Sequence, residues 1–278
     1  MNYIKLTVLI FVLFLFGCNQ TAKESNENSA PKTEDTLVQQ ENPNDNEKLA
    51  DDKIKSINNV IEVFKSNNID KISNIIRFPL DREYPIPSIK NKKEFKKRFN
   101  EVFDKILIDK IANSKIENWS EVGWRGIMLG NGVLWMANSN GIITSINYQS
   151  NIEKKLRSDL ISIEKENVHN SLKTFNIPKY KIKTKKYLIR IDELSDNIFR
   201  YASWKIGAEE SSKPDIIINN GTLDFDGSGG NHFFTFVKEN YTYKIYRNIM
   251  GEKNTPDITL EVEKGGKIIV TEDGQLVK

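Results

Sequence analysis

The spacing of apolar residues after residue 46 predicts helices first and strands afterwards. A first helix is expected over 48–66, where the apolar residues recur at helical spacing: Ile54, Ile57, Val60, Ile61 and Phe64. Asn91 can cap a later helix with Glu94 at its third position, and the apolar face of that helix would comprise Phe95, Phe99, Val102, Phe103 and Ile106. Strand-like runs then follow at 126–129, 133–136 and 142–148, separated by Gly- and Asn-containing turns.

A further helix is predicted to bridge this part to the rest of the chain. Ser150 and Glu153 have the spacing of a capping box, and the helix should end near 172–176, before Pro178. Its expected apolar stripe is Ile152, Leu156, Leu160 and Ile163. From residue 179 onward, many short apolar runs alternate with closely spaced turns. This pattern indicates a small all-β domain, either a sandwich or an open barrel.

The predicted fold class is therefore α+β, with a helix-plus-antiparallel-sheet domain over 47–150, a bridging helix over 151–178 and an all-β domain over 179–278. The first domain resembles NTF2-like exported domains through Arg77-Phe78-Pro79-Leu80, Ile89-Lys90-Asn91-Lys92-Lys93-Glu94-Phe95, Gly126-Ile127-Met128-Leu129 and Leu134-Trp135. The resemblance implies a cone that can enclose a pocket. Three tryptophans would either line such a pocket or fill the core: Trp119, Trp124 and Trp135.

The first 46 residues have a different pattern. Lys5 precedes an apolar run over 6–16, which is shorter than the roughly 20 residues of a spanning helix and is typical of a signal peptide. The sequence Leu15-Phe16-Gly17-Cys18 resembles the lipobox of bacterial lipoproteins, although Phe16 is bulkier than the usual residue at its position. The resemblance implies a signal peptide over 1–17 and acyl chains on Cys18. The polar residues up to 46 would then be a disordered tether.

Composition narrows the function classes. The chain has 41 Lys and Arg against 38 Asp and Glu, for a net charge of +3, so nothing in the charge balance calls for a nucleic-acid partner. Cys18 is the only cysteine, and its acylation would leave the mature chain without a thiol for disulfides or thiolate catalysis. We find no cofactor motif and expect none to be needed.

The densest polar cluster runs from Asp224 to His232. As a calcium loop it would place Asp224, Asp226 and Ser228 at positions one, three and five, but the twelfth position is Thr235 instead of glutamate. As a serine-nucleophile loop it has Asp and Gly exchanged relative to Gly-Asp-Ser-Gly-Gly, and it lacks the context of a triad. We therefore expect a Gly-rich turn without metal or catalytic residues, whose candidate binding residues are Asp224, Asp226, Ser228 and His232.

Paired acids and basic runs allow further alternatives. Asp192-Glu193 and Glu209-Glu210 would suit the acid and base of glycoside cleavage, or they are solvated loop charges. Lysines over 90–98 and 179–185 would contact anionic lipid, glycan or an acidic partner, or they form a solvated face and a protected edge strand.

Together these patterns predict a cell-envelope lipoprotein, held on the extracytoplasmic side of the cell membrane or outer membrane by lipid on Cys18. Its soluble body would bind an envelope protein, a glycan or a small ligand without catalysing a reaction. Two alternatives remain open at this point. The first is an envelope hydrolase with carboxylates in an inter-domain cleft, and the second is a structural or assembly subunit.

Overall fold

The computed structural model describes residues 49–227 and 229–277, and Lys48–Lys278 form one compact unit. The signal peptide, Cys18 and the tether predicted from the sequence lie outside the described residues. The helices are α1 (Asp51–Lys65), α2 (Ile69–Asn74), α3 (Lys92–Val102), α4 (Lys105–Ala112) and α5 (Asn151–Asn167), with 3-10 turns η1 (Ile116–Asn118), η2 (Gly123–Arg125) and η3 (Asn170–Leu172). The strands are β1 (Trp119–Glu121), β2 (Ile127–Leu129), β3 (Leu134–Met136), β4 (Ile143–Ile146), β5 (Ile177–Thr184), β6 (Tyr187–Ser195), β7 (Ile198–Lys205), β8 (Ile216–Asp226), β9 (Asn231–Lys238), β10 (Tyr241–Arg247), β11 (Ile258–Lys264) and β12 (Lys267–Leu276).

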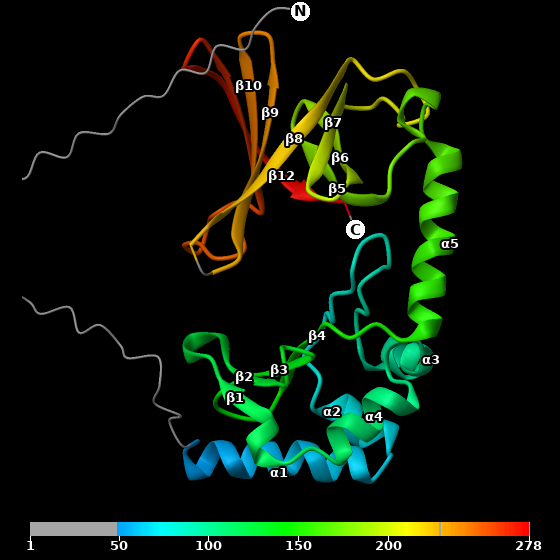
Figure 1. Cartoon of the computed structure of the whole chain (residues 1–278), viewed down its shortest axis with the longest axis vertical. Helices are drawn as coiled ribbons and strands as arrows, with labels where there is room; N and C mark the ends of the chain where they lie inside the picture. The colour runs from blue at the N-terminus through cyan, green and yellow to red at the C-terminus, as the bar shows by residue number, and fades with distance from the viewer. Residues whose placement is uncertain (1–48, 228, 278) are drawn as a thin grey trace, which may run out of the picture. The chain divides into compact units, whose positions relative to one another are not determined.

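The first part of this unit contains helices α1–α4 and a four-stranded antiparallel sheet in the order β1-β2-β3-β4 (Figure 1). The α1 residues predicted to face inward are buried in its core, except for half-buried Ile54. Asn91 caps α3 as predicted, because its Oδ1 accepts from the Glu94 N–H at 3.0 Å. The fold class predicted from the sequence is confirmed at this level: helices with a small antiparallel sheet, followed by a β domain.

The expected apolar face of α3 is wrong at its end. The helix stops at Val102, and Asp104 caps a separate helix by accepting from the Leu107 N–H at 2.9 Å. Phe103 stays in the core, whereas Ile106 is 64% exposed at the start of α4. The three tryptophans also do not share one pocket wall. Trp119 is buried, Trp135 is half-buried and Trp124 is largely exposed.

Helix α5 starts where predicted but ends earlier and presents a different face. The Ser150 Oγ accepts from the Glu153 N–H at 3.0 Å, and the helix ends at Asn167. Of the four residues expected in its apolar stripe, Leu156 and Leu160 are half-buried, whereas Ile152 and Ile163 are each more than half exposed. Glu153 is fully buried. Glu153 and Glu164 lie on the inward side of α5 because arginines from other segments pair with them, as described below.

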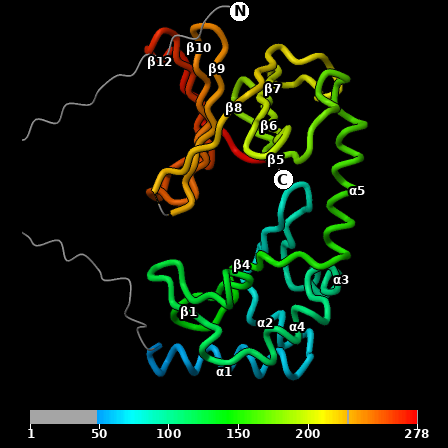
Figure 2. The backbone as a smooth tube through the Cα atoms, viewed as in Figure 1, coloured from blue at the N-terminus to red at the C-terminus, as the bar shows by residue number. Residues whose placement is uncertain are grey.

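Residues 177–276 form a closed eight-stranded barrel, not the sandwich or open barrel expected from the sequence. Figure 2 traces the backbone of these strands. Each strand pairs antiparallel with the next one in the chain, and residues 274–276 of β12 pair with residues 182–184 of β5. Closure removes both sheet edges. The lysine-rich β5 is therefore not an edge strand, since β6 and β12 both pair with it.

The barrel interior is packed by alternate residues of its strands, as the period of a strand requires. The buried interior residues are Ile182, Ile189, Ile191, Phe199, Tyr201, Ile218, Phe234, Phe236, Ile245, Ile258, Leu260 and Val262. A barrel of eight strands is just wide enough to be filled by side chains or to hold one small ligand. The residues above pack the interior, and a cavity lies at one end of the barrel.

Candidate functional site

A cavity of about 490 Å³ opens at one end of the barrel. Inward-facing residues of β5, β8, β9 and β10 supply its walls, together with the end of β12 and the loop 81–88. Leu223 and Phe234, which pair across β8 and β9, give it an apolar wall beside Tyr180, whose ring lies 5.7 Å from that of Phe234. Phe225, at the next inward position of β8, lies at the more exposed rim.

Tyr180 and His232 form a hydrogen-bonded pair in this cavity, with 2.8 Å between the phenol oxygen and Nε2. The His232 Nδ1 lies 2.8 Å from the Gly230 carbonyl, which can only accept, so Nδ1 carries a proton. In the neutral ring Nε2 then accepts from the Tyr180 hydroxyl. Burial lowers the pKa of His232 and raises the pKa of Tyr180, so both groups are held in their neutral forms.

Arg247 occupies an inward position at the end of β10. The preceding alternate residues, Tyr241, Tyr243 and Ile245, all belong to the barrel core, and the same alternation places Arg247 at the cavity. Its Nη1 donates to the carbonyls of Asn248 at 2.9 Å and Asp257 at 3.1 Å. The Arg247 charge lowers the pKa of His232 and opposes the effect of burial on Tyr180, because the three side chains lie close together.

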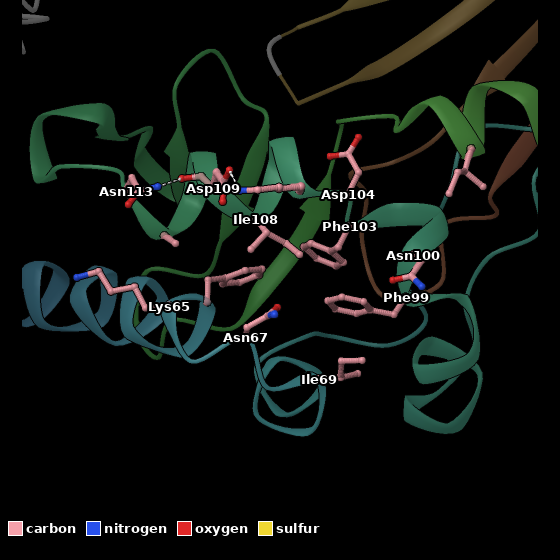
Figure 3. Close-up of a pocket in the computed structure, with 14 residues that line it drawn as sticks. Lys65, Asn67, Ile69, Phe99, Asn100, Phe103, Asp104, Ile108, Asp109 and Asn113 are labelled. Carbon is pink, nitrogen blue, oxygen red and sulfur yellow. Dashed lines mark hydrogen bonds and ion pairs between the residues drawn. The ribbon is translucent and has the colours of Figure 1, made fainter.

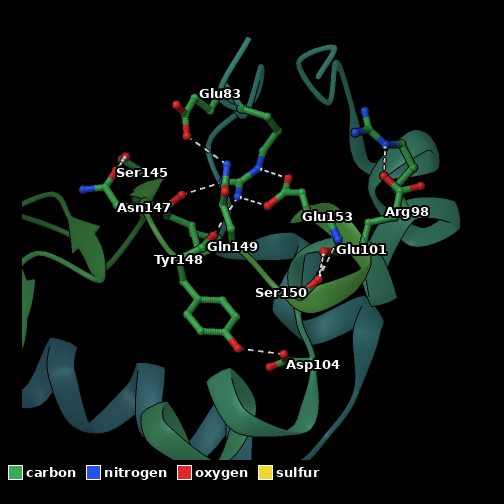
Figure 4. Close-up of polar contacts among 12 residues, drawn as sticks. Glu83, Arg98, Glu101, Asp104, Ser145, Asn147, Tyr148, Gln149, Ser150 and Glu153 are labelled. Atoms are coloured by element: carbon green, nitrogen blue, oxygen red, sulfur yellow. Dashed lines mark hydrogen bonds and ion pairs between the residues drawn. The ribbon is translucent and has the colours of Figure 1, made fainter. Parts of the chain in front are cut away.

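The loop 81–88 is held in place by Arg82. Its Nε and Nη2 donate to the two carboxylate oxygens of Glu153 at 2.6 and 2.5 Å, and Nη1 and Nη2 donate to the carbonyls of Ile146 and Tyr148. Figure 4 shows Glu153 and Tyr148 in these contacts, with Ser150 at the start of α5. Both charged side chains are almost fully buried, so this ion pair ties the cavity loop to β4 and α5.

A second buried ionic network joins α5 to the outer face of the barrel. Arg190 and Arg200 both donate to the carboxylate of Asp192, at 2.8 and 2.7 Å. Arg190 also pairs with Glu164 of α5 at 2.8 Å, and the Glu164 carboxylate accepts from the Tyr84 hydroxyl. Burial alone would lower the pKa of Arg190, but the surrounding carboxylates raise it above its usual value.

Most of the neighbouring acids at 192–193 and 209–210 form ion pairs, and two lysines of β5 are among their partners. Lys179 pairs with Glu193, and Lys181 pairs with Glu210, each at 2.6 Å. Asp192 is enclosed between two arginines. Such pairing is typical of structural charges and leaves these carboxylates little freedom to exchange protons with a substrate.

The structure brings one of the four predicted binding residues to the cavity. His232 lines it, whereas Asp224 and Asp226 are exposed on β8, and the Oδ2 of Asp224 accepts from the Thr222 hydroxyl at 3.5 Å. Ser228 lies outside the described residues. Sequence reasoning missed Tyr180 and Arg247. The sequence contained a signal for Arg247: in β10 every second residue from Tyr241 to Ile245 faces the core, and the same alternation places Arg247 on the inward face.

A second hollow of about 850 Å³ lies among α1, α3 and α4 (Figure 3). Its floor is formed by rings of the hydrophobic core, which are at most 5% exposed: Phe64, Phe99 and Phe103. At its rim, Asp104 accepts from the Tyr148 hydroxyl and caps α4, and Lys105 pairs with Asp109. Asp104, Lys105 and Asp109 already have partners within the protein, so we place the candidate ligand site at the barrel instead.

Comparison with protein families, curated proteins and solved structures gives no match to this chain. Within residues 49–227 and 229–277 no helix has the length and hydropathy needed to cross a membrane, and no cluster of three or more His, Cys, Asp or Glu side chains is arranged to hold a metal ion. The geometry of the barrel cavity is therefore the best guide to function.

Proposed function

We propose that this chain is a lipid-anchored binding protein of the cell envelope, which holds a small and largely apolar ligand at the barrel mouth. The cavity at that end supports the proposal, because its volume lies within the roughly 300–1,000 Å³ of small-molecule sites. Like such sites it combines apolar walls with a few converging polar groups. Tyr180, His232 and Arg247 would orient the ligand, and we assign no catalytic step to them.

The lipid anchor is proposed from the lipobox resemblance at Cys18 and places the binding body on the extracytoplasmic side of a membrane. The NTF2-like character of 47–150 likewise remains a proposal, supported by the helices and the four-stranded sheet. Metabolic labelling with palmitate should modify the wild-type chain and not a Cys18→Ser variant. Equal labelling of both would contradict the anchor.

The hydrolase and assembly-subunit alternatives have weaker support. A hydrolase needs an acid and a base that can exchange protons at a substrate. Three of the four acids that suggested it, Asp192, Glu193 and Glu210, are engaged with Arg190, Lys179 and Lys181, and the fourth, Glu209, is exposed. The described surface offers no feature that selects an assembly partner over a small ligand.

Filling the cavity tests the proposed function. In the Leu223→Trp variant the indole should occupy the space beside Phe234 and weaken binding of the neutral fluorescent probe N-phenyl-1-naphthylamine about tenfold or more. Fluorescence titration measures the affinity. All chains would carry Cys18→Ser, so that acyl chains do not bind the probe and any signal from the rest of the chain is common to all.

Val237→Trp is the matched control, since Val237 lies on β9, is 62% exposed and does not line the cavity. It should bind the probe as the parent chain does. The proposal is wrong if the parent chain does not bind the probe, or if Leu223→Trp and Val237→Trp bind it equally well.

A further inference from the structure

The cationic side chains that line the cavity differ in how closely they are paired with carboxylates. Four of its five cations have a carboxylate within 2.7 Å: Arg82 with Glu153, Arg157 with Glu83, Lys179 with Glu193, and Lys181 with Glu210. The remaining cation is Arg247, whose nearest described carboxylate is that of Asp257, at 3.8 Å. That carboxylate is more than half exposed to solvent, so it neutralises Arg247 only weakly.

The acids in the lining do not supply the missing partner. Glu83 is paired with Arg157 at 2.7 Å, and the carboxylate of Asp81 accepts from the Ser88 hydroxyl at 2.6 Å. Among the residues that the structure describes, no acceptor forms a hydrogen bond with Nε or Nη2 of Arg247, since both of its bonds use Nη1. The guanidinium therefore keeps donors available for a ligand.

The surroundings of Arg247 strengthen its preference for an anion. Its side chain is only 19% exposed, and a partly desolvated guanidinium attracts an anion more strongly than one in water does. Its neighbours Tyr180 and His232 are neutral and bonded to each other, so they neither compensate its charge nor repel an anion. Leu223 and Phe234 continue the cavity as an apolar wall.

We infer that the ligand is an amphipathic organic anion, whose acid group pairs with Arg247 and whose apolar body lies against Leu223, Phe234 and Tyr180. This inference rests on the proposed function, since it names the ligand class of the same cavity. Carboxylate, sulfonate and phosphate head groups share the relevant chemistry, because each presents two oxygens to a guanidinium fork. A neutral molecule with the same apolar body should bind more weakly.

Two probes with one skeleton separate charge from shape. 8-Anilinonaphthalene-1-sulfonate carries an anionic group on the same ring system as neutral N-phenyl-1-naphthylamine. The measured quantity is the affinity for the anionic probe divided by the affinity for the neutral probe. Both affinities are obtained by fluorescence titration of full chains that all carry Cys18→Ser. In the Arg247→Gln variant we expect the anionic probe to lose about tenfold or more in affinity, while the neutral probe changes by less than about twofold.

Two further variants keep the result interpretable. Lys244→Gln removes a cation from an outward position of the same strand and should leave the ratio unchanged. Arg247→Lys keeps the positive charge and should retain a ratio above that of Arg247→Gln, which also shows that position 247 tolerates substitution.

The possible outcomes test the anion assignment and the proposed binding function separately. If the parent chain binds neither probe, the proposed function fails, and the inference fails with it. If the parent chain binds the neutral probe but Arg247→Gln leaves the affinity ratio unchanged, only the anion assignment is overturned. A ratio that falls equally in Lys244→Gln would also overturn it, because the effect would then come from overall charge.

Discussion

Replacing Arg82 with methionine should lower the free energy of unfolding by about 3–5 kcal/mol, as expected when one partner of a buried ion pair is removed. The side chains of Arg82 and Glu153 are 2% and 0% exposed, and the guanidinium also donates to the carbonyls of Ile146 and Tyr148. The variant leaves the Glu153 carboxylate buried beside apolar atoms, where an uncompensated charge is costly. Urea denaturation of the full chain measures the loss.

Two comparisons separate this effect from a general loss of charge. Lys155→Met removes an exposed partner of Asp159 on the same helix and should change stability by about 0.5 kcal/mol or less. The double variant Arg82→Met with Glu153→Leu should recover much of the loss, because it removes both charges from the buried site. A loss below about 1 kcal/mol for Arg82→Met would show that the pair does not hold the cavity loop.

Asp192→Asn should have a comparable effect, about 3–5 kcal/mol, because it removes the carboxylate shared by two buried arginines. Arg190 would keep Glu164 and Glu210, but Arg200 would keep only neutral carbonyl acceptors. The two guanidinium groups would then repel each other inside the protein without a charge between them. The same denaturation measurement detects the loss.

Asp196→Asn provides the matched control, since Asp196 lies in the exposed turn between β6 and β7. It should unfold at the same urea concentration as the parent chain. If Asp192→Asn behaves like Asp196→Asn, the network on the outer face of the barrel does not contribute to stability as described.

Local patterns in the sequence were enough to place most elements. The caps at Asn91 and Ser150 act through hydrogen bonds within three residues, so the sequence predicts them directly. Barrel closure could not be predicted in the same way. It depends on residues 274–276 meeting residues 182–184, at the two ends of the β domain, and no local pattern encodes that pairing.

The face of α5 shows a second limit of sequence reasoning. Ile152 and Ile163 recur at helical spacing and therefore predicted an inward apolar stripe, yet both are exposed. The buried residue of α5 is Glu153, and Arg82, which lies 71 residues earlier in the chain, supplies the partner that makes its burial tolerable. A hydrophobicity pattern contains no information about a partner so distant in the chain.

The candidate site was only partly accessible from sequence. His232 was chosen because it lies in a polar cluster, whereas the structure places it at the cavity through the alternation of β9. The same alternation turns Asp224 and Asp226 outward on β8. Arg247 would have been found by extending the apolar positions of β10 to the end of the strand, but sequence alone does not show that this strand belongs to a closed barrel.

A crystal structure of the chain with bound 8-anilinonaphthalene-1-sulfonate tests the central claim most directly, because it distinguishes the barrel cavity from the hollow among α1, α3 and α4. The account predicts the ring system at the barrel mouth against Tyr180 and Phe234, with the sulfonate on Arg247. The probe in the helical hollow beside Phe99, with the barrel mouth empty, would contradict it.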